Sequence, residues 1–268
     1  MSDRRAPGSA TGEPINPYIG LRPYQESERE WFFGRDNDRK ILVDMILANR
    51  FSLLFAASGV GKSSLLQAAV LPYLKDPAHE NLDAVYCNNW AGDPVEGIRQ
   101  ATLSALHKRG RIPADALSPE LSQLPLPRFF DLYARFSRQP LIVVLDQFEE
   151  FFHYHRGSTR FQEYKDQLVK LFIDETLPIA IVISMREDFA LALNAFKPEL
   201  PTLLFNKFYR LEKLSRADAE AAIVQPAERC GFRYEPELLT KLLVDLAARE
   251  RVERPGTPVA ETALHIEP

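Results

Sequence analysis

The chain has 268 residues, a length that predicts one large domain, or one domain with a smaller companion. Hydrophobic residues make up 46% and charged residues 26%, a globular composition that can form a core without disulfides or metals. The formal net charge of −4 argues against a dedicated nucleic-acid binder, and Cys87 and Cys230 lie in no paired motif, which argues against a disulfide framework or a cysteine zinc site.

Cysteine usage and hydropathy both favour a cytoplasmic protein without a membrane partner. Unpaired cysteines suit a reducing compartment. The longest apolar runs, at residues 141–145 and 179–183, have only the length of a strand and are too short to span a bilayer. Residues 1–15 are rich in Gly, Ser and Pro, which predicts a disordered tail.

Ordered structure is expected from about Asn16. Ser27 is followed three residues later by Glu30, a spacing typical of a helix start, and apolar side chains on one face predict a helix over residues 36–49. Strands and helices then alternate. The predicted strands are 51–56, 84–87, 140–146, 178–184 and 205–211, and the predicted helices between them are 63–74, 94–108, 128–138 and 158–174.

This alternation predicts the α/β fold class. The strand segments are almost continuously apolar, which is typical of a parallel sheet covered by helices on both faces. From about Ser215 the pattern changes, because helices predicted over 216–229 and 236–249 follow one another without a strand. We interpret this last part as a small helical lid.

The strongest motif follows the first predicted strand. Ala56, Gly61, Lys62 and Ser63 match the looser phosphate-loop pattern A/G-x-x-x-x-G-K-S/T, whereas the strict pattern requires glycine at position 56. Such a loop wraps a polyphosphate so that its backbone N–H groups point inward. The candidate nucleotide-binding residues are Ala57, Ser58, Gly59, Val60, Gly61, Lys62, Ser63 and Ser64.

Each residue type in this loop has an expected role. Gly59 and Gly61 permit the backbone angles and the close approach that phosphate binding needs. Lys62 is expected to neutralise the β- and γ-phosphates, and the Ser63 hydroxyl to ligate Mg²⁺. The helix that begins there adds the positive end of its dipole. The alternative is a Gly-containing turn between a strand and a helix.

An acidic cluster follows the strand predicted over 140–146, which ends at Asp146. Open α/β sheets bind ligands at the carboxyl ends of their strands, so Asp146 is the second expected Mg²⁺ contact, through water. Glu149 or Glu150 is expected to polarise the attacking water, and we favour Glu149. The alternative is that both glutamates form the solvated first turn of a helix.

Arg186 follows the next strand. An arginine at this edge can contact the γ-phosphate and stabilise developing charge. The alternative is a surface arginine that pairs with Glu187 or Asp188. The expected catalytic set is Lys62, Asp146, Glu149, Glu150 and Arg186.

Four segments in this order resemble one family. They are NPYIGLRPYQESEREWFFGRD at residues 16–36, ASGVGKSSLLQAAVLPYL at 57–74, LIVVLDQFEEFF at 141–152 and ISMREDF at 183–189. From about Asn16 to Glu250 the chain resembles the bacterial STAND-type signalling ATPases, in particular the group called novel STAND NTPase 1.

The resemblance implies a fold and a mode of action. The fold is similar to that of AAA-type and of apoptotic or immune-receptor ATPases: a P-loop three-layer sandwich with an additional strand between the phosphate-loop strand and the Asp146 strand. Gly34 and Arg35 match a Gly-Arg pair that lies near the adenine in this family. Pro226 resembles a proline of the lid that touches the base in related switches. The alternatives are an aromatic core contact before a turn for residues 31–36 and a simple helix break at Pro226.

The resemblance also implies a molecular switch, which is ADP-bound and closed at rest and ATP-bound and oligomeric when active. The implied domains are a tail over 1–15, an NTPase domain over 16–212, a helical lid over 213–250, and a tail or truncated helical segment over 251–268. Ala56 departs from the strict loop pattern, which bears on the tightness of nucleotide binding. Related proteins carry an effector domain before and sensor repeats after this region, so we expect a fragment, a truncated gene product or one piece of a split system.

We expect an ATP-binding, slowly hydrolysing switch in a signalling or antiphage-defence system, which self-associates or contacts an effector or sensor protein. Two other functions fit the same loop: a scaffold that holds nucleotide at an inactive site, and a small-molecule kinase. The kinase is disfavoured because no acceptor-binding motif is recognisable, and a DNA-loading ATPase is disfavoured by the acidic charge. His153 and His155 lack an evident third ligand, so a histidine metal site is disfavoured. The expected metal is Mg²⁺, held by Ser63 and Asp146.

Overall fold

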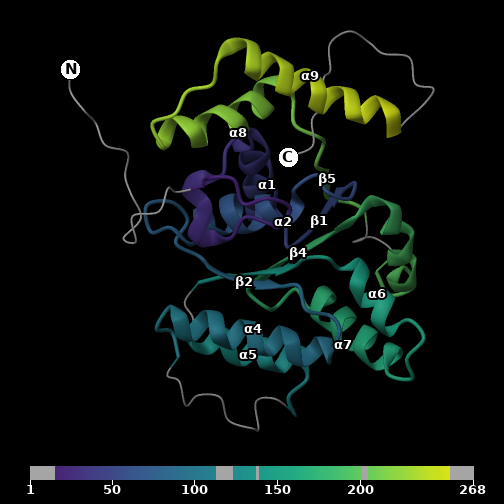
Figure 1. Cartoon of the computed structure of the whole chain (residues 1–268). Coiled ribbons are helices and arrows are strands. Elements are labelled where there is room, and N and C mark those ends of the chain that lie inside the picture. Colours follow the sequence, from purple (N-terminus) through teal and green to yellow (C-terminus); the bar gives the residue numbers. More distant parts are fainter. Residues whose placement is uncertain (1–15, 113–122, 137–138, 201–204, 254–268) are drawn as a thin grey trace. The chain divides into compact units, whose positions relative to one another are not determined.

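The computed structural model in Figure 1 describes residues 16–112, 123–136, 139–200 and 205–253. The predicted tail at 1–15 and residues 254–268 of the predicted last segment lie outside the described residues, whereas residues 251–253 of that segment belong to a helix. The chain divides into two compact units. Within the described residues the first unit comprises 16–39, 58–69 and 212–253, and the second comprises 40–57 and 70–211. The domain boundaries implied by the resemblance stay a prediction.

The second unit is built on a five-stranded parallel sheet. Its strands are β1 (Phe51–Ala56), β2 (Asp83–Cys87), β3 (Leu141–Leu145), β4 (Ile179–Arg186) and β5 (Phe208–Arg210). Their order across the sheet is β2-β3-β4-β1-β5, with every pairing parallel. The predicted α/β class is confirmed, and the additional strand is β4, between β1 and β3.

Helices flank this sheet. On one face lie α4 (Pro94–Lys108), α5 (Leu126–Phe136) and α7 (Phe161–Ile173) (Figure 1). The same unit contains α3 (Leu71–Lys75), α6 (Glu149–His155), the 3-10 helix η5 (Glu187–Phe196) and most of α1 (Asp36–Ala48). The apolar pattern does not predict η5, because it continues directly from β4 without a turn signal.

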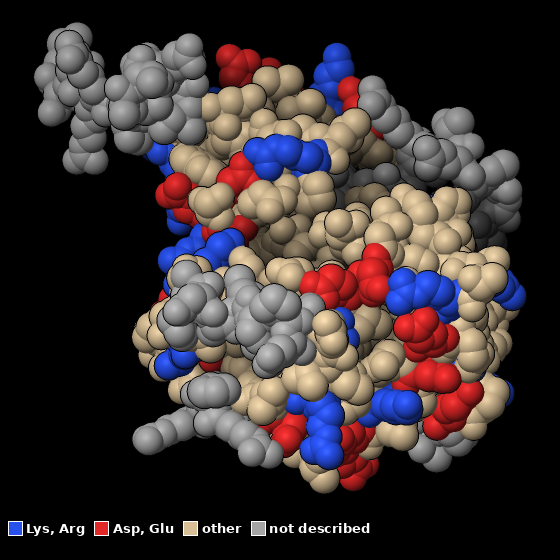
Figure 2. All heavy atoms as spheres, turned by 90° about the horizontal axis from the view of Figure 1, so that it is seen from below, with Lys and Arg blue, Asp and Glu red and all other residues tan. Residues whose placement is uncertain are grey.

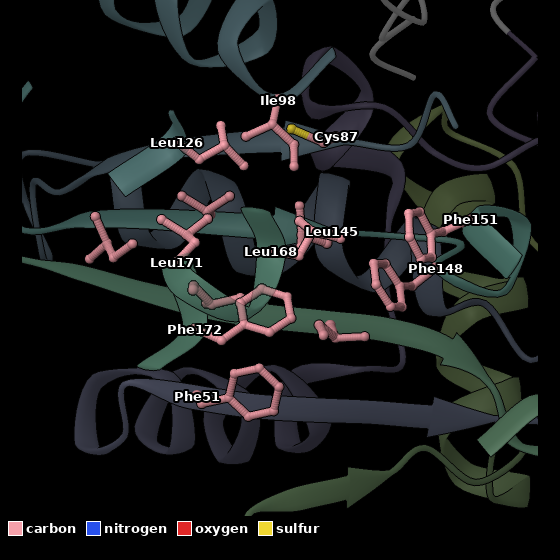
Figure 3. Close-up of a cluster of buried hydrophobic side chains, with 14 of the residues drawn as sticks. Phe51, Cys87, Ile98, Leu126, Leu145, Phe148, Phe151, Leu168, Leu171 and Phe172 are labelled. Carbon is pink, nitrogen blue, oxygen red and sulfur yellow. The ribbon is translucent and has the colours of Figure 1, made fainter. Parts of the chain in front are cut away.

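A continuous apolar core lies between the sheet and the helices α4, α5 and α7 (Figure 3). Every residue of β1 and of β3 is buried. Leu168, Leu171 and Phe172 of α7 pack into this core, and the ring centroid of Phe172 lies 5.3 Å from that of Phe51. Burying a side chain of this size stabilises a fold by about 1.5–3 kcal/mol, which explains why the strands are recognisable as unbroken apolar runs.

The first unit contains the helices of the predicted lid. They are α8 (Arg216–Arg229) and α9 (Pro236–Glu253), which contact each other (Figure 1). The Ser215 hydroxyl caps α8 by accepting the Asp218 N–H at 3.2 Å. Also in this unit are the 3-10 helix η1 (Glu26–Trp31), α2 (Lys62–Ser64) and most of the π-helical η2 (Leu65–Val70).

Two local predictions are wrong in detail. The helix near Ser27 begins earlier, at Glu26, and the Glu28 carboxylate accepts the Gln25 N–H at 2.9 Å. The stretch predicted as one helix over 63–74 consists of α2, η2 and α3, with a π-helical segment in the middle. The apolar spacing does not reveal that segment, because a wider turn over six residues shifts the buried face only slightly.

Candidate nucleotide-binding site

The phosphate loop follows β1 and leads into α2. Gly59 and Gly61 have φ angles of +80° and +97°, in the left-handed region that residues with side chains rarely adopt. Gly61 is the N-cap of α2, and its carbonyl accepts the Leu65 N–H at 2.9 Å. Both glycines therefore adopt the conformations that a phosphate loop requires.

The residue that departs from the strict motif lies inside a strand. Ala56 is the last residue of β1, is fully buried and stands opposite Arg186 of β4 in the sheet register. Extended backbone is available to alanine without strain, so the missing glycine costs the loop nothing at this position. The loop proper begins after it, where Ala57 is half-buried and Ser58 and Gly59 are exposed.

The remaining loop residues differ in exposure. Val60 is buried at 1% exposure and Lys62 at 9%, whereas Ser63 and Ser64 are half-buried at the start of the helix. The Ser64 hydroxyl accepts the backbone N–H of Tyr24 at 3.2 Å. This hydrogen bond attaches the segment before η1 to the helix that begins at the phosphate loop.

Arg35 connects three parts of the first unit. Its guanidinium, which is 5% exposed, donates to the Val60 carbonyl at 2.9 Å and to the Glu212 carbonyl at 2.8 Å. It also pairs with the Asp38 carboxylate at 2.8 Å. These bonds compensate the loss of hydration that burial imposes on a charge. Arg35 thus ties the phosphate loop to the chain that leads into α8.

Gly34 packs directly on the lid. Its φ is +78°, and a Cβ built there would lie 2.2 Å from the Asp218 carbonyl oxygen and 3.3 Å from the Ala222 Cβ. Only glycine allows this approach. The two residues that the resemblance assigns to the adenine neighbourhood therefore lie where the N-terminal segment meets α8.

An apolar cavity of about 360 Å³ lies beside these residues. The aromatic segment before α1 and the lid helices line it together. The lining residues are Tyr18, Ile19, Gly20, Leu21, Tyr24, Trp31, Phe32, Phe33, Arg35, Leu214, Ala219, Ala222, Ile223 and Leu246. Its size and apolar lining suit a flat organic ring.

Tyr18 fastens the N-terminal segment to the lid. Its hydroxyl donates to the Ile223 carbonyl at 2.5 Å and lies 3.0 Å from the Tyr234 hydroxyl. Burial, together with the Tyr234 hydrogen bond, raises the pKa of Tyr18 above its usual value. Pro226 is buried within α8, which continues to Arg229, so the alternative that this proline ends the helix is wrong.

The second unit holds the acidic part of the predicted site. Asp146 directly follows β3 and is fully buried. Its carboxylate Oδ2 accepts the Tyr86 hydroxyl at 2.6 Å, and its backbone carbonyl accepts the Trp90 Nε1–H at 2.8 Å. Sequence reasoning missed both partners, because no local pattern connects residues that lie 60 and 56 positions away.

The turn after Asp146 directs Glu149 toward β4. Gln147 has a φ of +54°, and the Phe148 N–H donates to the Ser184 carbonyl at 3.0 Å. The Glu149 carboxylate then accepts the Arg186 N–H at 3.2 Å and is 7% exposed. Both glutamates belong to the first turn of α6, but Glu149 is buried and Glu150 only half-buried, so the solvated-turn alternative does not describe Glu149.

The Arg186 side chain forms an ion pair. Its Nη2 lies 2.5 Å and its Nε 3.0 Å from the Asp188 carboxylate, and this bidentate pair raises the pKa of Arg186. Its guanidinium carbon lies 5.1 Å from the Phe189 ring centroid. The structure thus contains the pairing that the sequence offered as the alternative, and a contact from Arg186 to phosphate stays a prediction.

His155 and both cysteines are buried within the fold. The buried His155 places its Nε2 2.6 Å from the Trp90 carbonyl oxygen. Within the described residues, no group of three or more His, Cys, Asp or Glu side chains is arranged to hold a metal ion. Both cysteines are buried, and burial raises the pKa of the Cys87 thiol to about 12.

On the face that Figure 2 shows, lysine and arginine side chains are interspersed with aspartate and glutamate side chains. This distribution agrees with the near-balance of 33 basic and 37 acidic residues in the chain. None of the helices in the described part of the chain combines the length and the hydropathy needed to cross a bilayer.

Comparisons with known proteins agree with this geometry. A family model described as Novel STAND NTPase 1 matches residues 17–257. Among solved structures, a Walker-type ATPase of Pyrococcus abyssi is 14% identical with a TM-score of 0.56, and the match covers 88% of this chain and 71% of that one. The ORC2 protein of Aeropyrum pernix, solved as ADPNP–ADP complexes, is 16% identical with a TM-score of 0.55, covering 91% and 69%.

A third structural neighbour is the ORC1 protein of Aeropyrum pernix in complex with DNA. It is 17% identical with a TM-score of 0.51, and the match covers 82% of this chain and 56% of that one. No protein with curated annotation matches the sequence. At these identities the structural likeness establishes the fold, and together with the family match it supports nucleotide binding by a P-loop NTPase.

Proposed function

The chain belongs to the Novel STAND NTPase 1 family, and on that basis we propose that it is a nucleotide-operated switch. It binds ATP or ADP at the phosphate loop, hydrolyses ATP slowly, and changes its conformation and assembly with the nucleotide that it holds. A regulatory ATPase of this kind has a conformational output, because each nucleotide stabilises the state to which it binds more tightly.

The observation that carries the proposal is the set of hydrogen bonds made by Arg35. One side chain joins the Val60 carbonyl in the phosphate loop to the Glu212 carbonyl at the start of the lid segment, at 2.9 and 2.8 Å. A change in loop conformation must therefore move or break a bond to the lid segment.

We propose that the apolar cavity of the first unit receives the adenine base. Its volume of about 360 Å³ accommodates a purine, and its aromatic lining offers rings for stacking. Gly34 and Arg35 lie at the base end of the nucleotide in this proposal. Pro226 does not line the cavity, and it lies about one helical turn after the lining residue Ala222 in α8. The base would hold the lid against the N-terminal segment.

The residues of the proposed phosphate site have distinct roles. Lys62 neutralises phosphate oxygens, and the loop N–H groups between Ser58 and Ser63 donate hydrogen bonds to them. A bound Mg²⁺ supplies further charge neutralisation, and Ser63 and Asp146 would hold it, since both offer the oxygen ligands that Mg²⁺ prefers. The buried carboxylate of Asp146 fits this role, because a buried anion is stabilised by a cation.

Glu149 is the proposed general base. It would accept a proton from the attacking water, while Glu150 stays outside the reaction. The backbone N–H of Arg186 holds the Glu149 carboxylate at the end of β4, where the side chain of Arg186 also begins. In this proposal Arg186 exchanges Asp188 for the γ-phosphate when ATP is bound, so hydrolysis depends on a side-chain rearrangement that breaks an exposed ion pair.

The biological setting is proposed from the family alone. We propose cytoplasmic signalling, with antiphage defence as the setting and self-association or an effector or sensor protein as the partner. The chain offers mixed surface charge where it is seen in Figure 2, so nucleic acid is not part of the proposal.

Tryptophan fluorescence tests nucleotide binding directly. The chain has two tryptophans, and Trp31 lines the proposed base cavity whereas Trp90 is buried in the second unit. We expect ADP to change the emission of the unaltered chain, and Trp31→Phe to remove most of that change while binding measured by calorimetry persists. The proposal would be refuted if neither ADP nor ATP bound in the presence of Mg²⁺.

A further inference from the structure

Tyr86 lies on the strand next to the one that ends at Asp146. In the register of the parallel pair β2 and β3, Tyr86 stands opposite Val144. Asp146 lies two residues beyond Val144 and therefore on the same face of the sheet, at the diagonal position that a long side chain can reach. The Tyr86 hydroxyl spans this diagonal and donates to Asp146 Oδ2 at 2.6 Å.

The chain after β2 also holds Asp146. The Asp146 N–H donates to the Cys87 carbonyl, and the Trp90 indole N–H donates to the Asp146 carbonyl, each at 2.8 Å. Trp90 is itself fixed, because its carbonyl oxygen lies 2.6 Å from His155 Nε2 and its ring packs edge-on against Phe148 at 5.1 Å. The backbone and the carboxylate of Asp146 are thus both held by β2 and the loop that follows it.

We propose that Tyr86 is a positioning residue for the Mg²⁺-dependent step of nucleotide binding, an inference that rests on the proposed function. Its hydroxyl holds one oxygen of the Asp146 carboxylate and so fixes the rotamer of that side chain. A carboxylate accepts about four hydrogen bonds or metal contacts, so the tyrosine leaves it able to take a hydrated cation. Partners of metal ligands typically contribute 10–100-fold to metal affinity.

The chain offers a matched control at the other end of β2. The buried Tyr133 hydroxyl donates to Asp83 Oδ2 at 3.0 Å, so Tyr133→Phe removes the same kind of tyrosine–aspartate hydrogen bond. Asp83 begins β2, whereas Tyr86 reaches the carboxyl end of the sheet. A general loss of stability is common to both variants, and an effect on Mg²⁺ is expected of Tyr86→Phe alone.

The test is binding of a fluorescent, non-hydrolysable ATP analogue, measured in EDTA and over a range of Mg²⁺ concentrations. For Tyr86→Phe we expect unchanged affinity in EDTA and a Mg²⁺ midpoint raised about 10-fold, the lower end of the range for such partners, because Asp146 acts through water. For Tyr133→Phe we expect the midpoint of the unaltered chain. Adding Tyr86→Phe to Asp146→Asn should cause no further shift.

Two results would overturn the inference, and they distinguish the role of Tyr86 from the proposed function. A Mg²⁺ midpoint equal in Tyr86→Phe and Tyr133→Phe, in a chain that binds the analogue, would overturn the role of Tyr86 alone. Failure of the unaltered chain to bind the analogue at any Mg²⁺ concentration would refute the proposed function and this inference with it.

Discussion

The contact between Gly34 and α8 makes the replacement Gly34→Ala a severe test of the first unit. The added Cβ would lie 2.2 Å from the Asp218 carbonyl oxygen and 3.0 Å from its carbonyl carbon, both of them backbone atoms. Backbone atoms of a helix cannot rotate away as a flexible side chain can. The N-terminal segment and α8 must therefore move apart, or Gly34 must leave its conformation.

The size of the effect follows from two costs. A left-handed conformation, here a φ of +78°, costs an alanine about 1–2 kcal/mol. Overpacking against fixed neighbours adds about 1–3 kcal/mol. We expect Gly34→Ala to lower the free energy of unfolding by about 2–5 kcal/mol and the melting temperature by about 4–20 °C.

Gly20→Ala separates these two costs. Gly20 has a φ of +75°, but a Cβ there would meet no atom within 4 Å. Only the backbone cost applies to this variant, so its free energy of unfolding should fall by about 1–2 kcal/mol. Urea unfolding followed by circular dichroism measures both variants, and calorimetry with ADP should show weaker binding for Gly34→Ala. Equal destabilisation of the two variants would refute the close packing of Gly34 on α8.

Three further predictions concern the acidic site, acid stability and thiol reactivity. Glu149→Gln should lower ATP turnover about 10²–10⁴-fold without loss of ADP affinity, and Glu150→Gln should change turnover little; the reverse result, measured by phosphate release, would move the base to Glu150. The Arg22 guanidinium lowers the pKa of Glu28 from 4.5 to about 2, so the stability that Glu28 contributes is present above pH 4.5 and lost as the pH falls toward 2. Urea unfolding at pH 5 and pH 3 should therefore show a smaller decline for Glu28→Gln than for the unaltered chain, and parallel declines would exclude this contribution. Because burial raises the pKa of Cys87 to about 12, a thiol reagent at pH 8 should label it only after unfolding, and rapid labelling of the native chain would contradict its burial.

The fold and the phosphate loop could be predicted because their physical signals are local. Buried parallel strands leave unbroken apolar runs, as in residues 51–56 and 141–145, and a phosphate loop needs glycines at set spacings, here Gly59 and Gly61. The order of the strands in the sheet could not be predicted from such local signals. The position of β4 between β1 and β3 came from the family resemblance, since no periodicity in one sequence reveals which strands are neighbours.

The contacts that the sequence could not reveal are those between distant residues. Tyr86 and Trp90 hold Asp146 across two strands, and Tyr18 reaches the Ile223 carbonyl 205 positions away. Such pairs depend on the tertiary fold and leave no pattern in their own segments. Arg35 is an intermediate case, because the resemblance marked the residue while only the structure identifies its bonds to the Val60 and Glu212 carbonyls.

The central claim is that the chain is a switch that holds its nucleotide, and the nucleotide retained through purification tests it most directly. The protein is denatured, and the released nucleotide is identified and counted by chromatography against the protein concentration. The proposed switch predicts close to one ADP per chain, because a slowly exchanging resting state keeps its product. An empty site that turns over added ATP rapidly would contradict the switch and favour a free-running enzyme, and an empty site that binds no added ATP would favour an inactive scaffold.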